Sequence, residues 1–273
     1  MPYDSESPPS GRTGCPLNPT RSAPPIVHLA TALGAILAAA TFAVADAQAP
    51  AIAQPAAPFS TGKPGTALPT GWTLLKLSSL KRSTEYKLVE DQGIVVLNAR
   101  AEAAASGVLH LASFDIRTAP VMEWRWKISN LIEGADNSVA GKEDSPVRIV
   151  LGFDGDKSKL GFRDRTASTL AKTGSGRELP YAQLIYIWSN AKPVGTVIEN
   201  PHTKRVEMVV AASGGTGVGK WMTLSRNVVD DFKKAFGEEP GKLTEIGVLT
   251  DTDNTNATVE AWYGDIQFVP AQK

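Results

Sequence analysis

The sequence predicts a mainly β protein: an antiparallel β-sandwich of the jelly-roll, galactose-binding-like or concanavalin-like kind, with one or two short helices. Three observations favour this fold class. About ten short runs rich in β-branched and aromatic residues are separated by turn signals. Several runs alternate apolar and polar residues, as strands with one buried face do. Helical patterns are missing between most of the runs, which argues against an α/β fold.

Two segments show the alternation most clearly, and we expect their apolar side chains to fill the core. Successive residues of a strand point to opposite faces, so every second residue shares a face. The expected core residues are Met122, Trp124, Trp126 and Ile128 in the first segment, and Val147, Ile149, Leu151 and Phe153 in the second.

Two helices are expected. Residues 227–237 place Val228, Val229, Phe232 and Phe236 on one stripe. Asn227 suits the N-cap position, and Gly237 suits a C-terminal stop. A weaker helical pattern lies within residues 159–176, a long polar insertion.

The N-terminal part predicts export. Residues 26–44 are almost entirely apolar and are followed by small residues, which indicates a signal peptide over 1–47 with cleavage after Ala47. An uncleaved membrane anchor is the alternative, since about 19 apolar residues approach the length that spans a bilayer. After cleavage no stable membrane span remains, and we expect a periplasmic or secreted protein. Residues 48–70 form an Ala/Pro-rich linker with no core of its own, and 71–273 form a single β-sandwich domain.

The amino-acid composition limits the classes of partner that we expect. The chain carries 28 Lys and Arg against 28 Asp and Glu, which gives no reason to expect nucleic acid or an anionic membrane. Its single cysteine, Cys15, precedes the predicted cleavage site. The mature chain would therefore have no disulfide, no thiolate nucleophile and no lipid-modified cysteine.

A glycine-rich stretch imitates a nucleotide-binding loop. Gly214, Gly219 and Lys220 match the first seven positions of a P-loop, and an apolar run precedes them. A P-loop needs Ser or Thr after the lysine and a helix behind it. Trp221 occupies that position, and the residues after it alternate like a strand. We therefore expect a hairpin connection and no nucleotide.

Several long blocks resemble a known family. These blocks are MEWRWKISNLIEGAD, KEDSPVRIVLGFD, YIWSNAKPVGTVIENPHTKRVEMVV, WMTLSRNVVDDFKKAFGEEP and IGVLTDTDNTNATVEAWYGDIQF, covering residues 120–269. The chain resembles the secreted bacterial family catalogued as domain of unknown function 3047. The resemblance implies a single-domain secreted protein similar to carbohydrate-binding jelly-roll modules, and it supplies no reaction. Glu143 and Asp144 stand where the family pattern tends to have paired acids. By similarity to such modules alone, Asp265, before the last strand, joins the calcium candidates.

Residues 250–258 form the densest polar group. Asp251, Asp253, Asn254 and Asn256 follow an apolar strand and offer the hard oxygen ligands that calcium prefers. An Asx-rich turn, whose side chains bond to the backbone, is the alternative. The EF-hand glycine and distant glutamate are missing, so an EF-hand is excluded.

Two further candidates lie at the ends of strands. Asp144 and Arg148 stand four residues apart across Pro146, where an ion pair would fix a loop or hold sugar hydroxyls. Trp188, beside Ser189 and Asn190, is the candidate for an exposed ring that stacks on a ligand.

Three functions remain open. The first is an exported, non-catalytic sandwich that binds a saccharide or other polar cell-envelope ligand through Asp144, Arg148, Trp188, Asp251, Asp253 and Asn254, with calcium at Asp251, Asp253 and Asp265 as an option. The second is a glycoside-active enzyme that pairs Asp144 with Asp251 or Asp253. The third is a structural envelope protein recruited through residues 160–176. Apart from such carboxylates the sequence offers no catalytic set, because neither His110 nor His202 lies near a nucleophile motif.

Overall fold

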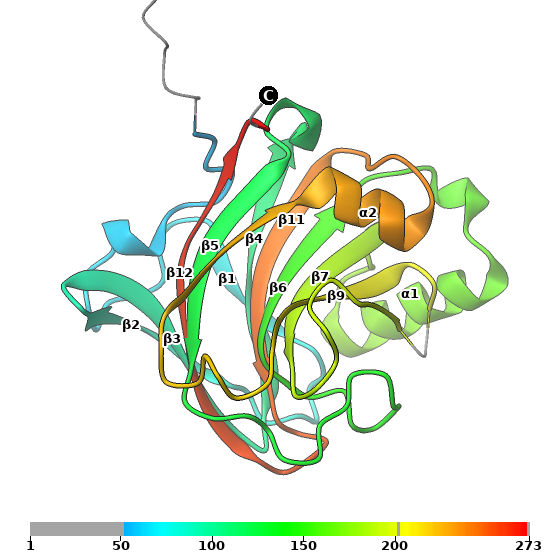
Figure 1. Cartoon of the computed structure of the whole chain (residues 1–273). Helices are drawn as coiled ribbons and strands as arrows, with labels where there is room; N and C mark the ends of the chain where they lie inside the picture. The colour runs from blue at the N-terminus through cyan, green and yellow to red at the C-terminus, as the bar shows by residue number, and fades with distance from the viewer. Residues whose placement is uncertain (1–51, 201–202, 272–273) are drawn as a thin grey trace, which may run out of the picture. The chain divides into compact units, whose positions relative to one another are not determined.

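The computed structural model describes residues 52–200 and 203–271 (Figure 1). The chain divides after Ala47 into two units, and the first of them lies outside the described residues. The predicted signal peptide therefore lies outside them too and stays a prediction. Within the described ranges, no helix has the length and apolar character needed to cross a membrane.

The second unit is built from two β-sheets (Figure 1). The larger sheet has, in spatial order, β1 (Trp72–Lys76), β4 (Ala105–Phe114), β11 (Leu243–Asp251), β6 (Ser145–Phe153), β7 (Ala182–Ser189), β9 (Val206–Ser213) and β8 (Val197–Glu199). The smaller sheet has β10 (Met222–Asn227), β5 (Val121–Ile128), β12 (Thr258–Val269), β3 (Ile94–Glu102) and β2 (Glu85–Asp91). Short 3-10 turns cover Phe59–Thr61, Ile116–Thr118 and Lys157–Lys159. The mainly β sandwich with two helices is confirmed.

The core lies between the two sheets. Both predicted apolar faces are buried there, the one on β5 and the one on β6. The indoles of Trp124 and Trp126 meet edge to face at 5.4 Å, and Trp126 lies 6.4 Å from Trp188 of the opposite sheet. Aromatic side chains bury large areas, and the contact of Trp126 with Trp188 joins the two sheets.

One strand pair departs from the antiparallel expectation. β7 and β9 run parallel, while the other pairs among the described strands are antiparallel. A parallel pair needs a crossover of a dozen or more residues. Residues 190–205 supply it, and they include the short strand β8, which pairs with the outer edge of β9.

The segment predicted as a linker packs on the sandwich. Ala53 and Phe268 exchange two backbone hydrogen bonds of 2.8 Å. Phe59 is buried against Trp72, with ring centroids 4.7 Å apart, and the indole of Trp72 donates to the carbonyl of Ala57. The expectation that residues 48–70 add nothing to a core is therefore wrong for the described part of that segment. The alanines and prolines of the segment indicated a linker, whereas the side chain of Phe59 anchors it to the core.

The stronger of the two predicted helices is α2 (Val228–Phe236). The side chain of Asn227 accepts from the backbone of Val229 and Asp230, and Gly237 ends the helix at φ 71°. The side chain of Phe232 is buried, and its ring centroid lies 4.8 Å from that of Phe153. Helix α2 therefore closes one end of the core.

The second helix is α1 (Phe162–Ser175), which lies in the polar insertion as expected. None of its side chains described by the structure is buried. Helix α1 therefore buries no side chain against the sheet among those described, whereas α2 buries Phe232.

The glycine-rich stretch connects β9 to β10, which belong to different sheets. It crosses the sandwich, so the expected hairpin is wrong. Gly214 and Gly219 take φ of 69° and 76°, which suit glycine. Trp221 leads into strand β10, and the helix that a P-loop requires is replaced by this strand.

Candidate functional site

The outer face of the larger sheet is apolar as well as the inner face. A second apolar cluster covers it, formed by Ile185, Ile187, Ile198, Val206, Met208 and Val210, with Val150 beside them. A strand that is buried on both faces has a nearly continuous apolar sequence. The sequences of β7 and β9 are of this kind. The face turned away from the main core is thus apolar and is covered by other parts of the chain at these residues.

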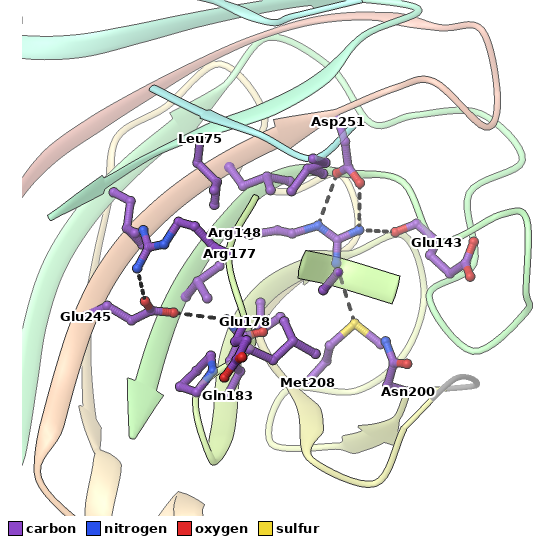
Figure 2. Close-up of a pocket in the computed structure, with 18 residues that line it drawn as sticks. Leu75, Glu143, Arg148, Arg177, Glu178, Gln183, Asn200, Met208, Glu245 and Asp251 are labelled. Carbon is purple, nitrogen blue, oxygen red and sulfur yellow. Dashed lines mark hydrogen bonds and ion pairs between the residues drawn. The ribbon is translucent and has the colours of Figure 1, made fainter. Parts of the chain in front are cut away.

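A cavity of about 300 Å³ lies over this outer face (Figure 2). Ligand pockets start at about this volume. Its aliphatic lining comprises Leu75, Leu77, Leu109, Val150, Ala171, Leu179, Pro180, Ile185, Met208 and Leu249. Its polar lining comprises Glu143, Arg148, Arg177, Glu178, Gln183, Asn200, Glu245 and Asp251.

One glycine leaves room for a carboxylate that lines the cavity. A Cβ at Gly152 of β6 would lie 2.3 Å from Cγ of Glu245 on the neighbouring strand β11. The missing side chain lets the Glu245 chain lie across β6, with its carboxylate directed to Gln183 and Arg177.

A buried ion pair forms one polar end of the cavity. Nε and Nη2 of Arg148 each lie 3.0 Å from an oxygen of Asp251, and Nη2 also donates to the carbonyl of Glu143. Arg148 is 7% exposed and Asp251 8%. Burial raises the pKa of Asp251 above its usual range, and Asp144 adds to the rise, whereas Arg148 and the amide of Ser145 lower it.

A second pair forms the other end. Arg177 lies 2.9 Å from one oxygen of Glu245, and Nε2 of Gln183 donates to the other at 3.2 Å. Glu245 and Asp251 are six residues apart on the same face of β11, so about 20 Å of strand separates the two ends. The cavity is therefore elongated, with a charged pair at each end (Figure 2).

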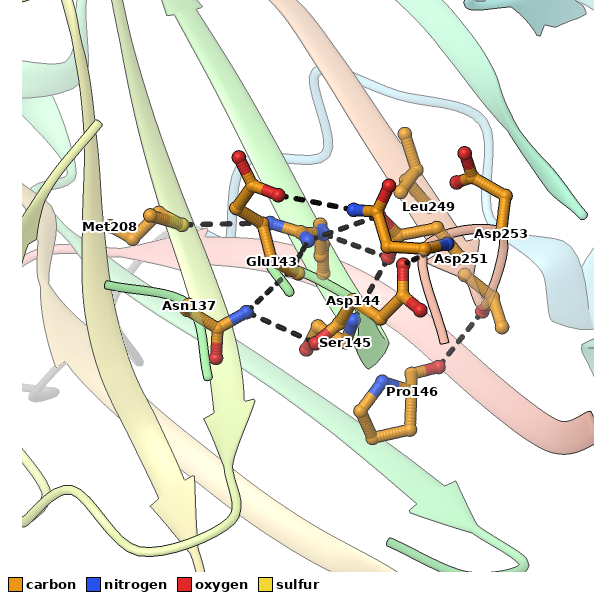
Figure 3. Close-up of polar contacts among 12 residues, drawn as sticks. Asn137, Glu143, Asp144, Ser145, Pro146, Met208, Leu249, Asp251 and Asp253 are labelled. Carbon is orange, nitrogen blue, oxygen red and sulfur yellow. Dashed lines mark hydrogen bonds and ion pairs between the residues drawn. The ribbon is translucent and has the colours of Figure 1, made fainter. Parts of the chain in front are cut away.

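Asp144 does not pair with Arg148 as the sequence spacing suggested. Its oxygens accept from the backbone and hydroxyl of Thr255, at 2.8 and 2.6 Å, and from the backbone of Asn254. Figure 3 shows Asp144 close to Asp251 and Asp253. Asp144 is 1% exposed, so it holds the turn at residues 250–258 in place and has no ligand-facing surface. Register between β6 and β11 brings Arg148 to Asp251 instead.

The other two polar candidates sit at the margin of this region. Asn254 is exposed, and its Nδ2 donates to Glu143 at 3.1 Å. Asp253 forms an ion pair of 2.5 Å with Lys81. Neither of them lines the cavity.

The carboxylates that could hold a cation are a different set from the expected one. Asp144, Asp251 and Asp253 each offer an oxygen within 4.8 Å of the others. Asp265 lies on the smaller sheet, where it accepts from the backbone and hydroxyl of Ser60 at 3.0 and 2.5 Å. Its place in the calcium set is therefore wrong, since it fixes the N-terminal segment.

Trp188 is not an exposed platform. It is 1% exposed, and its indole donates to the carbonyl of Gly214 at 3.0 Å. Because both faces of β7 are buried, the apolar run gave no sign of which of its rings reach solvent.

Sequence reasoning missed the second polar end altogether. Arg177 follows α1, and Gln183 and Glu245 lie in strands. One signal was available: the period of two in β11 puts Glu245, Gly247, Leu249 and Asp251 on one face. It would have linked Glu245 to the aspartate already chosen.

Fold and site together define a β-sandwich with a ligand-sized, charge-flanked cavity on the outer face of one sheet. The family model described as "Protein of unknown function (DUF3047)" matches residues 70–267, and the chain belongs to this family. No curated protein matches the chain.

Solved structures with a similar fold include two carbohydrate-binding modules of Clostridium thermocellum. The family 11 module of a cellulosomal cellulase is 8% identical with a TM-score of 0.40, covering 82% of this chain and 98% of the module. The family 30 module is 12% identical with a TM-score of 0.38, covering 82% and 99%. The xyloglucanase domain of a type three effector from Sinorhizobium fredii, in complex with cellobiose, is 7% identical with a TM-score of 0.39, covering 74% and 94%.

Proposed function

We propose that the protein is an exported, non-catalytic binding protein that holds a saccharide, or another hydroxyl-rich ligand of the cell envelope, over the outer face of its larger sheet. The observation that carries the proposal is the pair of arginine–carboxylate contacts at the two ends of one elongated cavity, Arg148 with Asp251 and Arg177 with Glu245. Planar charged groups that fix one another form strong, directional hydrogen bonds to hydroxyl groups.

The charges favour a neutral ligand. Four carboxylates, of Glu143, Glu178, Glu245 and Asp251, line the cavity against the two guanidinium groups. An excess of acceptors suits hydroxyl donors and disfavours anions. A hydroxyl group gains access beside Arg177, whose side chain is 39% exposed, because the side chains of Glu245, Arg148 and Asp251 are nearly closed off.

Calorimetric titration of the full chain with a panel of neutral cell-envelope oligosaccharides tests the proposal. We expect binding to the wild type and a loss of about tenfold or more in Glu245→Gln, because a hydrogen bond to a charged group is replaced by a weaker one. The matched control is Glu102→Gln, whose carboxylate is exposed, contacts Arg82 and lies outside the cavity. Absence of binding across the whole panel would count against the proposal.

Export is part of the same proposal. In a host with a periplasm, the mature chain is expected to begin at Gln48, which mass spectrometry of the periplasmic fraction measures. An intact N-terminus on a membrane-bound product would favour the uncleaved anchor.

Glycoside hydrolysis is the alternative, and one observation favours it. Oxygens of Asp144 and Asp251 lie within 4.8 Å, near the spacing of about 5 Å in retaining glycosidases, and the pKa of Asp251 is raised by burial. Binding is favoured over hydrolysis because Asp144 is buried and engaged by Thr255 and Asn254. Release of reducing sugar by the wild type but not by Asp251→Asn would reverse that preference.

Calcium binding stays a prediction, and the set that we propose for it, Asp144, Asp251 and Asp253, has Asp144 in place of Asp265. A hard cation takes six to eight oxygen ligands, and Arg148 and Lys81 already neutralise two of these carboxylates. Thermal unfolding with added calcium and with a chelator measures the coupling. An Asp265→Asn variant should respond to calcium like the wild type.

A further inference from the structure

A second cavity adjoins the first. It has a volume of about 590 Å³ and is lined by Phe162, Arg163, Thr166, Ala167, Leu170, Leu179, Gln183, Asn200, Thr203 and Val206. It shares Leu179, Gln183 and Asn200 with the first cavity. Both cavities lie between α1 and the outer face of the larger sheet, since residues of the helix and of the sheet line each of them.

Helix α1 bridges this space without filling it. At its start, Asp164 accepts from the hydroxyl of Thr203 and the backbone of Lys204, at 2.7 and 3.1 Å. Beyond its end, Arg177 is held by Glu245. Two large apolar side chains of the helix, Phe162 and Leu170, are 88% and 66% exposed, although both line the second cavity.

A helix that covers a sheet normally buries its apolar side chains against it, as Phe232 of α2 does. α1 keeps two such side chains beside an apolar sheet face and leaves space between them. The space therefore suits an apolar occupant.

The lining indicates the kind of apolar group. The apolar part of the first cavity is entirely aliphatic among the described residues, with leucine, valine, isoleucine, methionine, alanine and proline side chains. Flexible aliphatic walls and a methionine accommodate a chain of variable shape, whereas flat groups are usually met by aromatic rings. At the polar margin of the first cavity, carboxylates outnumber guanidinium groups by four to two, and the second cavity adds Arg163.

We propose that the two cavities beneath α1 hold an alkyl chain, so that the ligand is a neutral saccharide carrying a single acyl or alkyl chain, with its sugar at the Arg177–Glu245 end. This inference rests on the proposed function and names the class of ligand for the same site. Burying methylene groups supplies affinity, while the carboxylates take up hydroxyl groups and repel a fatty-acid anion.

The expected dependence on chain length is steep. Each buried methylene contributes about 0.8 kcal/mol, which corresponds to about a fourfold gain in affinity. A series of hexyl, octyl and decyl β-glucosides, titrated calorimetrically into the full chain below their micelle concentrations, should therefore gain about 10- to 20-fold for every two carbons until the cavities are full.

A substitution on the exposed helix tests the location without touching the core. Leu170→Glu places a charge in the second cavity and should weaken binding of the decyl glucoside by about tenfold or more. Leu80→Glu is the matched control, because Leu80 is 94% exposed and lines neither cavity, and it should bind like the wild type.

The outcomes separate the two proposals. Affinity that does not change with chain length, or that Leu170→Glu leaves unaltered, overturns the alkyl-chain inference and leaves saccharide binding intact. Tighter binding of decanoate than of decyl glucoside overturns the neutral head group. Chain-dependent binding of the glucosides that Glu245→Gln does not weaken supports the alkyl site and overturns the saccharide contact.

Discussion

The buried pair of Arg148 and Asp251 should respond unequally to the loss of either partner. Asp251→Leu leaves a guanidinium group that is 7% exposed without its carboxylate, and arginine cannot shed its charge. Breaking a buried pair in this way costs about 3–5 kcal/mol of the free energy of unfolding. Arg148→Met leaves a carboxyl group whose pKa burial already raises, and which escapes its charge by taking up a proton.

The sign of the pH dependence follows. In Arg148→Met, the pKa of Asp251 in the folded state is above its unfolded value, so the folded state binds the extra proton. Stability is then highest below the unfolded pKa and falls as pH rises through the folded pKa. We expect Arg148→Met to be less destabilised at pH 5 than at pH 8, and Asp251→Leu to be destabilised at both.

Urea unfolding followed by tryptophan fluorescence measures these free energies. The double variant Arg148→Met, Asp251→Leu should lose less than Asp251→Leu alone, because an apolar pair replaces the ions without leaving a buried charge. A double variant as unstable as the sum of the two single variants would refute this reasoning. So would an Asp251→Leu variant that is less destabilised at pH 5 than Arg148→Met.

Three further predictions concern other parts of the molecule. Phe59→Ala should lower the free energy of unfolding by about 3–5 kcal/mol in denaturant titrations, since the ring is fully buried, whereas a freely solvated segment would show almost no change. Glu207 is buried with Oε2 unpartnered, and burial, with Glu199 opposite, raises its pKa to about 7. The wild type should therefore lose stability between about pH 4.5 and 7, and Glu207→Gln should reduce that loss; equal pH profiles would contradict the assignment. Gly152→Ala should weaken saccharide binding in calorimetry, because its Cβ displaces Glu245, and unchanged affinity would show that this carboxylate is dispensable.

The period of two predicted the core face of β5, because that strand has one face against the core and one half-exposed face. The same reasoning failed for Trp188, since β7 is covered on both sides and its run from Leu184 to Trp188 is apolar throughout. Pattern alone distinguishes the faces of a strand only where they meet different surroundings.

Pairings of charged residues were predicted poorly for a different reason. Asp144 and Arg148 are close in sequence, but Arg148 lies in β6 beside β11, and that register presents Asp251 to it. The partner is 103 residues away, and only the order of strands in the sheet determines it. Asp265 was assigned by its place before the last strand, and its true partner, Ser60, lies in a segment expected to be unstructured.

The contact between Ala53 and Phe268 brings the two ends of the folded unit side by side. A short peptide could therefore join them, and new termini could be opened at residues 92–93, the exposed turn between β2 and β3 of the smaller sheet, which line neither cavity. Such a circularly permuted chain should keep its ligand, and a fusion partner attached at either original end would emerge from the same place on the smaller sheet.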